Sequence, residues 1–223
     1  MRRGPVGERF GPDPARLPEL LATPEPKRIP EDAADVRAAV TLLLTPEPEI
    51  PESIEALFGL RAEVEGDPWS GHVALPGGRR DTGDADLLDT ARRELREETH
   101  IDLPRSACVG RLDDLHPRST HLPSIAITPF VAWLPERPDV RENYELAGHI
   151  WIPISDLADP ERRSTLERRT PVPRVFETIE YAGAVVWGLT LAIVEDFLWR
   201  IGARPRVPGR PAGGPDEANG ETR

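Results

Sequence analysis

Residues 76–101 read PGGRRDTGDADLLDTARRELREETHI, and this stretch predicts a glycine turn that leads into a helix. Asp84 or Asp86 can begin the helix, because an aspartate carboxylate accepts a hydrogen bond from a first-turn amide and favours the positive end of the helix dipole. The helix should end near Thr99 or His100. We therefore expect the rest of the domain to be arranged around this stretch.

The acidic residues of this helix border its apolar face. At about 100° per residue, one face collects four apolar side chains: Leu87, Leu88, Ala91 and Leu95. Glu94 and Glu98 fall at the edge of that face, and Glu97 lies slightly further out. Like charges at such spacings destabilise a helix, so carboxylates that border a core require a compensating cation. Either a nearby arginine or a metal ion must supply it.

The composition is that of an acidic chain with one cysteine. It has 223 residues, a formal net charge of −11 and a pI near 5.0, which argues against general affinity for nucleic acid or anionic lipid. Cys108 is the single cysteine, so neither an intramolecular disulfide nor a cysteine metal cluster can form. We find no secretory signal and no run of roughly 20 apolar residues that would span a membrane. These features predict a cytoplasmic protein without a nucleic-acid or membrane partner.

A single domain is expected between two tails. Residues 1–30 are rich in Pro, Arg and Glu and predict a mobile or loosely docked N-terminal arm, with one short helical turn at residues 17–21. The domain itself should occupy residues 31–202. Residues 203–223 are rich in Pro and Gly and predict a disordered C-terminal tail.

Apolar runs between proline-rich loops predict the strands of the domain. The predicted strands are residues 36–44, 56–62, 71–75, 108–115, 125–134, 146–152 and 174–181. A short helix capped by Ser155 and a closing helix at residues 187–201 complete the series. This order of strands, one acidic helix, further strands and a last helix indicates an α+β domain.

Three carboxylates along one helix edge suit a hard divalent cation. Glu94, Glu97 and Glu98 offer only oxygen ligands, which favour Mg²⁺ or Mn²⁺ over Zn²⁺. Arg93 and Glu97 are one helical turn apart and can pair, which would hold a carboxylate in position. Such a cation, beside a glycine turn that can approach phosphate, would support hydrolysis of a phosphoanhydride. From the helix alone, a solvated and salt-bridged surface helix is the stronger interpretation.

The stretch resembles the signature of the Nudix hydrolases, in which Gly, five residues, Glu and seven residues precede Arg-Glu-apolar-x-Glu-Glu-x-Gly-apolar. Residues 93–101, RELREETHI, follow the second half of that signature. The resemblance implies an α/β/α sandwich with a mixed sheet, and a metal-dependent attack of water on a nucleoside diphosphate linked to another group. It also implies that Glu94, Glu97 and Glu98 serve the metal ions or activate water, and that Arg93 orients them.

One departure from the signature points to the coenzyme A pyrophosphatase branch of that family. Asp84 stands where the first Glu is expected, and eight residues rather than seven separate it from Arg93, as is common in that branch. The residues before the glycines resemble the element associated with coenzyme A recognition, with Leu75 in place of Phe. Asp67 occupies the position of an expected arginine, so the coenzyme A signature is incomplete, and His100 replaces the Gly that ends the helix. These two departures leave the substrate open.

The resemblance also assigns roles outside the helix. Glu145 resembles an acidic position ahead of the family's Trp-Val-Pro strand and is a candidate catalytic acid or base. Candidate substrate-binding residues are Arg61, Gly77, Gly78 and Arg79.

The resemblance implies Mg²⁺ or Mn²⁺ as the cofactor and a small nucleoside diphosphate derivative as the partner. The expected substrate is coenzyme A or an acyl derivative, cut into adenosine 3',5'-bisphosphate and a phosphopantetheine product. The alternatives are hydrolysis of another nucleoside diphosphate derivative and a nucleotide-binding Nudix module without catalysis. A homodimer is compatible with the sequence.

Overall fold

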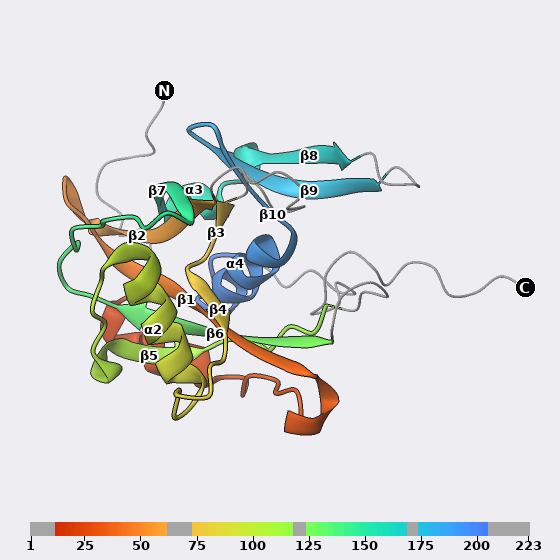
Figure 1. The fold of residues 1–223 in the computed structure, drawn as a ribbon. Helices are drawn as coiled ribbons and strands as arrows, with labels where there is room; N and C mark the ends of the chain where they lie inside the picture. The colour runs from red at the N-terminus through yellow and green to blue at the C-terminus, as the bar shows by residue number, and fades with distance from the viewer. Residues whose placement is uncertain (1–11, 62–72, 118–123, 169–173, 205–223) are drawn as a thin grey trace, which may run out of the picture.

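The computed structural model describes residues 12–61, 73–117, 124–168 and 174–204 (Figure 1). Its α-helices are α1 (Leu17–Ala22), α2 (Leu87–Thr99), α3 (Ile154–Ala158) and α4 (Gly188–Arg200). Its strands are β1 (Val36–Glu47), β2 (Ile50–Arg61), β3 (Val73–Ala74), β4 (Gly77–Arg79), β5 (Cys108–Arg111), β6 (Ile125–Trp133), β7 (Leu146–Pro153), β8 (Arg163–Arg168), β9 (Arg174–Tyr181) and β10 (Ala184–Trp187). Short 3₁₀ turns cover Pro14–Arg16, Glu31–Ala33, Arg105–Ala107 and Pro160–Arg162.

The larger sheet has seven strands and is mixed. Its main path is β3-β2-β1-β6-β5, with β4 also paired to β1 and β7 also paired to β2. The pairing of β1 with β6 is parallel, whereas the other pairings in this sheet are antiparallel. A smaller antiparallel sheet has the order β10-β9-β8 and lies at the top of Figure 1.

Helices cover both faces of the larger sheet. Along β1, Leu42 and Leu44 join a core cluster that also contains the buried side chains of α1 and α4. Leu43, between them, points to the opposite face and joins the cluster that contains Leu95 of α2. This alternation follows from the two-residue period of a strand. The sheet therefore lies between two layers of helices, which confirms the expected α/β/α arrangement. Figure 1 shows α2 and α4 on the two sides of the sheet.

Most of the predicted elements occur near the predicted residues. The predicted strand at 36–44 becomes β1, the predicted acidic helix becomes α2, and the predicted closing helix becomes α4. Two predictions were wrong in detail. Gly77 and Gly78 form the extended strand β4 against β1 rather than a turn, and α3 follows Pro153 without a side-chain cap from Ser155.

The segment of residues 12–30 differs from the loosely docked arm that the composition predicts. Leu17 and Leu21 are 0% and 1% exposed and lie in the core. Arg200 of α4 donates hydrogen bonds to the carbonyl oxygens of Leu21 and Pro24 at 3.1 and 2.6 Å. Two leucines one turn apart cover apolar surface, and this burial outweighs the proline-rich composition around them. Residues 1–11 lie outside the described part of the chain.

The C-terminal side of α4 is described only as far as residue 204, so most of the predicted tail at 203–223 lies outside the described residues. Among the helices of the described segments, none is long and apolar enough to cross a membrane.

Candidate active site

Both ends of α2 are capped by residues of the central stretch. Asp86 is the N-cap, and its side chain accepts a hydrogen bond from Asp89 N at 2.9 Å. His100 ends the helix in a left-handed conformation with φ of 58°, and its amide donates to Arg96 O at 2.9 Å. The His100 Nδ1 atom lies 2.7 Å from Arg141 O. A histidine thus takes the position that the family signature gives to glycine.

The three glutamates of α2 differ in exposure as the helical period predicts. Glu98 is 7% exposed, next to the buried Leu95. The side chain of Glu94 is 16% exposed and that of Glu97 is 49% exposed. The prediction that Glu94 and Glu98 border the core, with Glu97 further out, is therefore confirmed.

Arg93 gathers the acidic side chains of the site. Its Nη1 atom lies 2.8 Å from Glu94 Oε1 and 3.2 Å from Glu97 Oε2. Its Nε and Nη2 atoms each lie 3.0 Å from one oxygen of Asp84, which makes a bidentate pair. Nη2 also donates to Arg79 O at 3.0 Å. One guanidinium thus fixes three carboxylates and a main-chain carbonyl, and the predicted pair of Arg93 with Glu97 is present.

Asp84 is a site residue that the sequence reasoning did not include among its candidates. Its side chain is 6% exposed, and its Oδ2 atom accepts hydrogen bonds from Asp81 N and Thr90 Oγ1, both at 2.9 Å. The hydrogen bonds from Arg93 are the main cause that holds the pKa of Asp84 well below its usual range. The signal in the sequence was the displaced acidic position of the signature, which marked Asp84 as a departure without showing its partner.

Strand β4 brings the two predicted glycines against the site. Gly78 pairs with Ala39 of β1, and a Cβ atom on Gly78 would lie 2.6 Å from the Glu94 carboxylate. A Cβ atom on Gly77 would lie 2.3 Å from Ala39 O. Gly78 therefore gives space to a side chain of the site, whereas Gly77 gives space to the backbone of the sheet.

Other predicted substrate-binding residues are less clearly placed. Arg79 is exposed and contributes its carbonyl oxygen to Arg93. Arg61 ends β2 opposite Leu146 of β7, but its side chain lies outside the described part of the structure. Asp67 also falls outside the described residues.

The loop before β7 carries Glu145 to the carboxylates of α2. Arg141 N donates to Thr99 O at 3.0 Å, and Asn143 N donates to Glu98 O at 3.1 Å, so the loop is fixed to the C-terminal turn of α2. Glu145 N in turn donates to Asn143 Oδ1 at 2.9 Å.

Burial is the main cause that raises the pKa of Glu94. The hydrogen bond and charge of Arg93 lower that pKa, while the charges of Glu97 and Glu145 raise it further. The carboxylates on α2 and the carboxylate of Glu145 therefore act on one another.

The chemistry of these side chains fits a hard divalent cation. Glu94, Glu97, Glu98 and Glu145 present oxygen donors only, which Mg²⁺ and Mn²⁺ prefer. A cation would also offset the burial, and the smaller repulsion from Glu97 and Glu145, that raise the pKa of Glu94. Within residues 12–61, 73–117, 124–168 and 174–204, no three His, Cys, Asp or Glu side chains are grouped to hold a metal ion. In this arrangement Arg93 is the counter-ion of Glu94 and Glu97.

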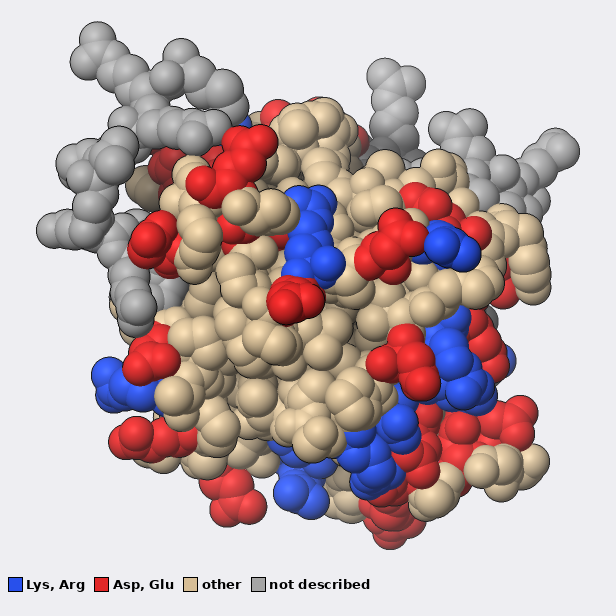
Figure 2. Space-filling model, turned by 90° about the vertical axis from the view of Figure 1, so that its left-hand side faces the viewer, with Lys and Arg blue, Asp and Glu red and all other residues tan. Residues whose placement is uncertain are grey.

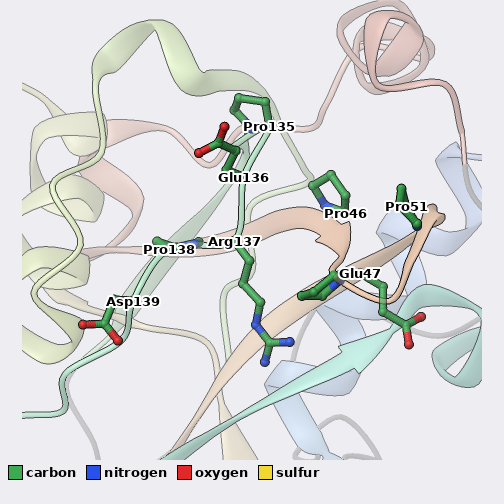
Figure 3. Close-up of a pocket in the computed structure, with 9 residues that line it drawn as sticks. Pro46, Glu47, Pro51, Pro135, Glu136, Arg137, Pro138 and Asp139 are labelled. Carbon is green, nitrogen blue, oxygen red and sulfur yellow. The ribbon is translucent and has the colours of Figure 1, made fainter.

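A groove of about 610 Å³ lies elsewhere, between the β1–β2 hairpin and the loop after β6 (Figure 3). Arg137 reaches from that loop to within 3.1 Å of Glu55 Oε1, and its guanidinium lies 4.9 Å from the centre of the Trp151 ring. Burial of Glu55 raises its pKa to about 7. Five prolines line the walls of the groove: Pro46, Pro48, Pro51, Pro135 and Pro138. The glutamates of α2 are not among the lining residues, so the groove is separate from the carboxylate site.

The surface charges give no sign of a broad cationic region on the face drawn in Figure 2. Uncharged residues occupy much of the centre of that face, and acidic and basic side chains of the described residues lie next to one another around it, mainly toward the lower right. This pattern agrees with the ion pairs between arginines and acids, such as Arg105 with Asp86 at 2.6 Å.

A model of the NUDIX domain matches residues 37–174. An uncharacterised protein of Schizosaccharomyces pombe is 38% identical over 106 residues, which are 45% of this chain and 32% of that protein, so the match spans about a third of that relative. The uncharacterised Nudix hydrolase NudL of Photorhabdus laumondii is 26% identical over 186 residues, which are 82% of this chain and 93% of NudL. A MutT/nudix family protein from Enterococcus faecalis has a crystal structure that is 19% identical, with a TM-score of 0.49, over 78% of this chain and 59% of that one.

Proposed function

Because the chain belongs to the NUDIX domain family, whose model matches residues 37–174, we propose that it is a metal-dependent hydrolase of nucleoside diphosphate derivatives. The observation that carries the proposal is the contact set of Arg93, which holds Asp84, Glu94 and Glu97 together beside Glu98. A solvated surface helix would not need a bidentate pair to an aspartate that is 6% exposed.

We assign each residue of the site a separate role in hydrolysis. Glu94, Glu98 and Glu97 would hold Mg²⁺ or Mn²⁺, which when bound neutralises charge on the diphosphate and makes a water molecule more acidic. Arg93 keeps the carboxylates in place through its four contacts. Glu145 lies on a loop that is fixed to α2, and we assign it the role of the general base that removes a proton from the attacking water. Gly78 leaves room for the Glu94 carboxylate beside β4.

For the substrate we propose coenzyme A or an acyl derivative, cut at the diphosphate into adenosine 3',5'-bisphosphate and phosphopantetheine or its acyl form. The support is the spacing from Asp84 to Arg93 and the Gly77-Gly78 pair, which resemble that branch of the family. Asp67 and Leu75 depart from the coenzyme A element, and they favour a second candidate, another nucleoside diphosphate derivative.

The test is turnover of a substrate panel with Mg²⁺ or Mn²⁺, comparing wild type with Glu98→Gln. The panel should hold coenzyme A, acetyl-coenzyme A, ADP-ribose and a dinucleoside polyphosphate. Loss of one carboxylate should lower kcat on the order of 100-fold or more. Glu161→Gln, on an exposed 3₁₀ turn, is the matched control and should keep wild-type turnover.

Two outcomes would contradict the proposal. Turnover that is unchanged in Glu98→Gln would exclude the assigned site. A rise in Tm with nucleotide but no product from any substrate would indicate a binding module, since a ligand that binds the folded state stabilises it without chemistry.

A further inference from the structure

Tyr144 is an aromatic side chain that the fold leaves in solvent. It is 87% exposed, and among the described residues it shares this exposure of a large apolar side chain only with Val175. A single exposed apolar side chain is ordinary on a protein surface. The position of Tyr144 beside the carboxylate site is what distinguishes it.

The backbone on both sides of Tyr144 is fixed to the site. Asn143 N donates to Glu98 O at 3.1 Å, and Asn143 Oδ1 accepts from Glu145 N at 2.9 Å. Leu146 N donates to Asn143 O at 3.4 Å, which closes a turn around Tyr144. The ring is therefore exposed without being carried on a freely moving segment.

The Tyr144 hydroxyl faces the same carboxylates. Its hydrogen bond to Glu145 is the main cause that raises the pKa of the Tyr144 phenol, and the charge of Glu97 adds to this effect. One end of the side chain is tied to the acidic cluster, while the face of the ring remains open to solvent.

We propose that the Tyr144 ring binds a planar aromatic group of the substrate, the base of a nucleoside diphosphate, by stacking. This inference rests on the proposed function, because it places the diphosphate at the carboxylates of α2. A ligand whose diphosphate lies there brings its remaining groups past the rim of the site, where Tyr144 stands. Aromatic rings stack on the face of any base, so Tyr144 would contribute affinity for the base of the substrate without discriminating between adenine and other bases.

The test measures binding of two probes in the presence of Mg²⁺ by titration calorimetry. ADP carries a base and a diphosphate, whereas inorganic pyrophosphate carries a diphosphate alone. In Tyr144→Leu the Kd for ADP should rise about ten-fold, while the Kd for pyrophosphate stays within about two-fold of wild type. Tyr144→Phe and Tyr144→Trp keep an aromatic face and should keep the Kd for ADP.

Val175→Ala removes the other exposed apolar side chain and serves as the control for a general surface effect. The proposal is overturned if wild type binds ADP no more tightly than pyrophosphate, or if Tyr144→Leu changes both Kd values equally or neither. Circular dichroism of each variant checks that the fold is retained. Binding is read without turnover, so absence of hydrolysis by wild type would refute the proposed function while leaving the stacking result readable.

Discussion

At the scale of single residues, the site is organised by the match between one guanidinium and several carboxylates. Arg93 presents five N–H donors in a fixed plane, and it uses them on Asp84, Glu94, Glu97 and the Arg79 carbonyl. A lysine in that position would offer a point charge without the planar fork. The carboxylates can therefore lie close together before any metal ion binds.

Asp84→Asn should loosen this arrangement. The amide keeps the shape of the side chain, but it removes the charge that receives the bidentate pair from Arg93. We expect kcat to fall at least about ten-fold and the free energy of unfolding to fall by about 1–3 kcal/mol, the usual cost of disturbing a buried charged hydrogen bond. Steady-state kinetics and urea unfolding measure the two effects.

The control for Asp84→Asn is Asp139→Asn, because Asp139 also pairs with an arginine but its side chain is 79% exposed. That variant should differ little from wild type in either measurement. If Asp84→Asn behaved in the same way, Asp84 would have no role in positioning Arg93.

Sequence reasoning at this scale succeeded where the period of one helix was sufficient. The order of exposure of Glu98, Glu94 and Glu97 follows from 100° per residue and needed no tertiary information. The pairing of Arg93 with Asp84 joins a loop to a helix, and the distance between their side chains depends on how β4 lies against β1. The spacing of the two residues in the sequence does not determine that distance.

At the scale of elements, β4 connects the sheet to the site. The sequence predicts a turn at Gly77 and Gly78, because two adjacent glycines permit backbone angles, or a close approach of a ligand, that a side chain would forbid. In the structure both glycines are extended beside β1, and they are small because β1 and the Glu94 side chain approach them closely. Small size rather than turn geometry is the property that the fold uses here.

Alanine substitutions should separate the roles of these glycines. In Gly78→Ala the new methyl group meets the Glu94 carboxylate, the end of a flexible side chain, so kcat should fall about ten-fold while stability changes by less than about 1 kcal/mol. In Gly77→Ala the methyl group meets the main chain of Ala39 and Val40, so stability should fall by about 2 kcal/mol or more.

Gly83→Ala is the matched control, because its nearest neighbour would be Asp81 Oδ1 at an ordinary contact distance of 3.6 Å. Denaturant unfolding and kinetics on all three variants give the comparison. Equal losses of activity and stability in Gly77→Ala and Gly78→Ala would show that the two positions do not have separate roles.

Elements with strong apolar periodicity were predicted, and polar ones were missed. α4 has Leu191, Val194 and Phe197 on a buried face, and its predicted range was close to the observed one. β8 reads RSTLER and has no apolar run, so nothing in its sequence indicated a strand. β8 forms through its antiparallel pairing with β9, the next strand along the chain, and such pairing is not encoded in the composition of β8 itself.

At the scale of the whole molecule, the predicted α+β class depended on the order of elements, whereas the sandwich depended on the family resemblance. The structure adds that residues 12–30 belong to the layer formed with α4. Lys27 N donates to Asp113 Oδ1 at 2.9 Å, and Arg200 Nη2 lies 2.6 Å from the same oxygen. Composition does not encode such long-range contacts, so the proline-rich composition of this segment predicts an arm.

The titration of Glu55 should make the free energy of unfolding depend on pH. Its pKa is about 7 in the folded protein, above the value of 4.5 for the free side chain, so the folded state binds this proton more tightly. The contribution to stability is therefore fully present below about pH 4.5 and is lost as pH rises to about 7, by up to about 3 kcal/mol. Urea unfolding between pH 5 and pH 8 should show this decrease.

Glu55→Gln should flatten that profile, because the amide does not titrate. Glu136→Gln, at an exposed residue of the same groove, should leave the slope unchanged. The raised pKa of Glu94 acts in the same direction and remains in both variants, while the lowered pKa values of Asp84 and Glu142 act at more acidic pH. An unchanged slope in Glu55→Gln would show that Glu55 is not the titrating group.

The contact between α1 and α4 also bears on how the protein is made. The carbonyl of Leu21 and the guanidinium of Arg200 are 179 positions apart, so α1 leaves the ribosome long before its partner has been translated. At a translation rate of about 5–20 residues per second, α4 is completed roughly 10–40 s after Leu17 and Leu21 have been synthesised. During this interval a nascent chain exposes the leucines to chaperones or to neighbouring chains, and synonymous codons that slow translation before α4 would lengthen the exposure.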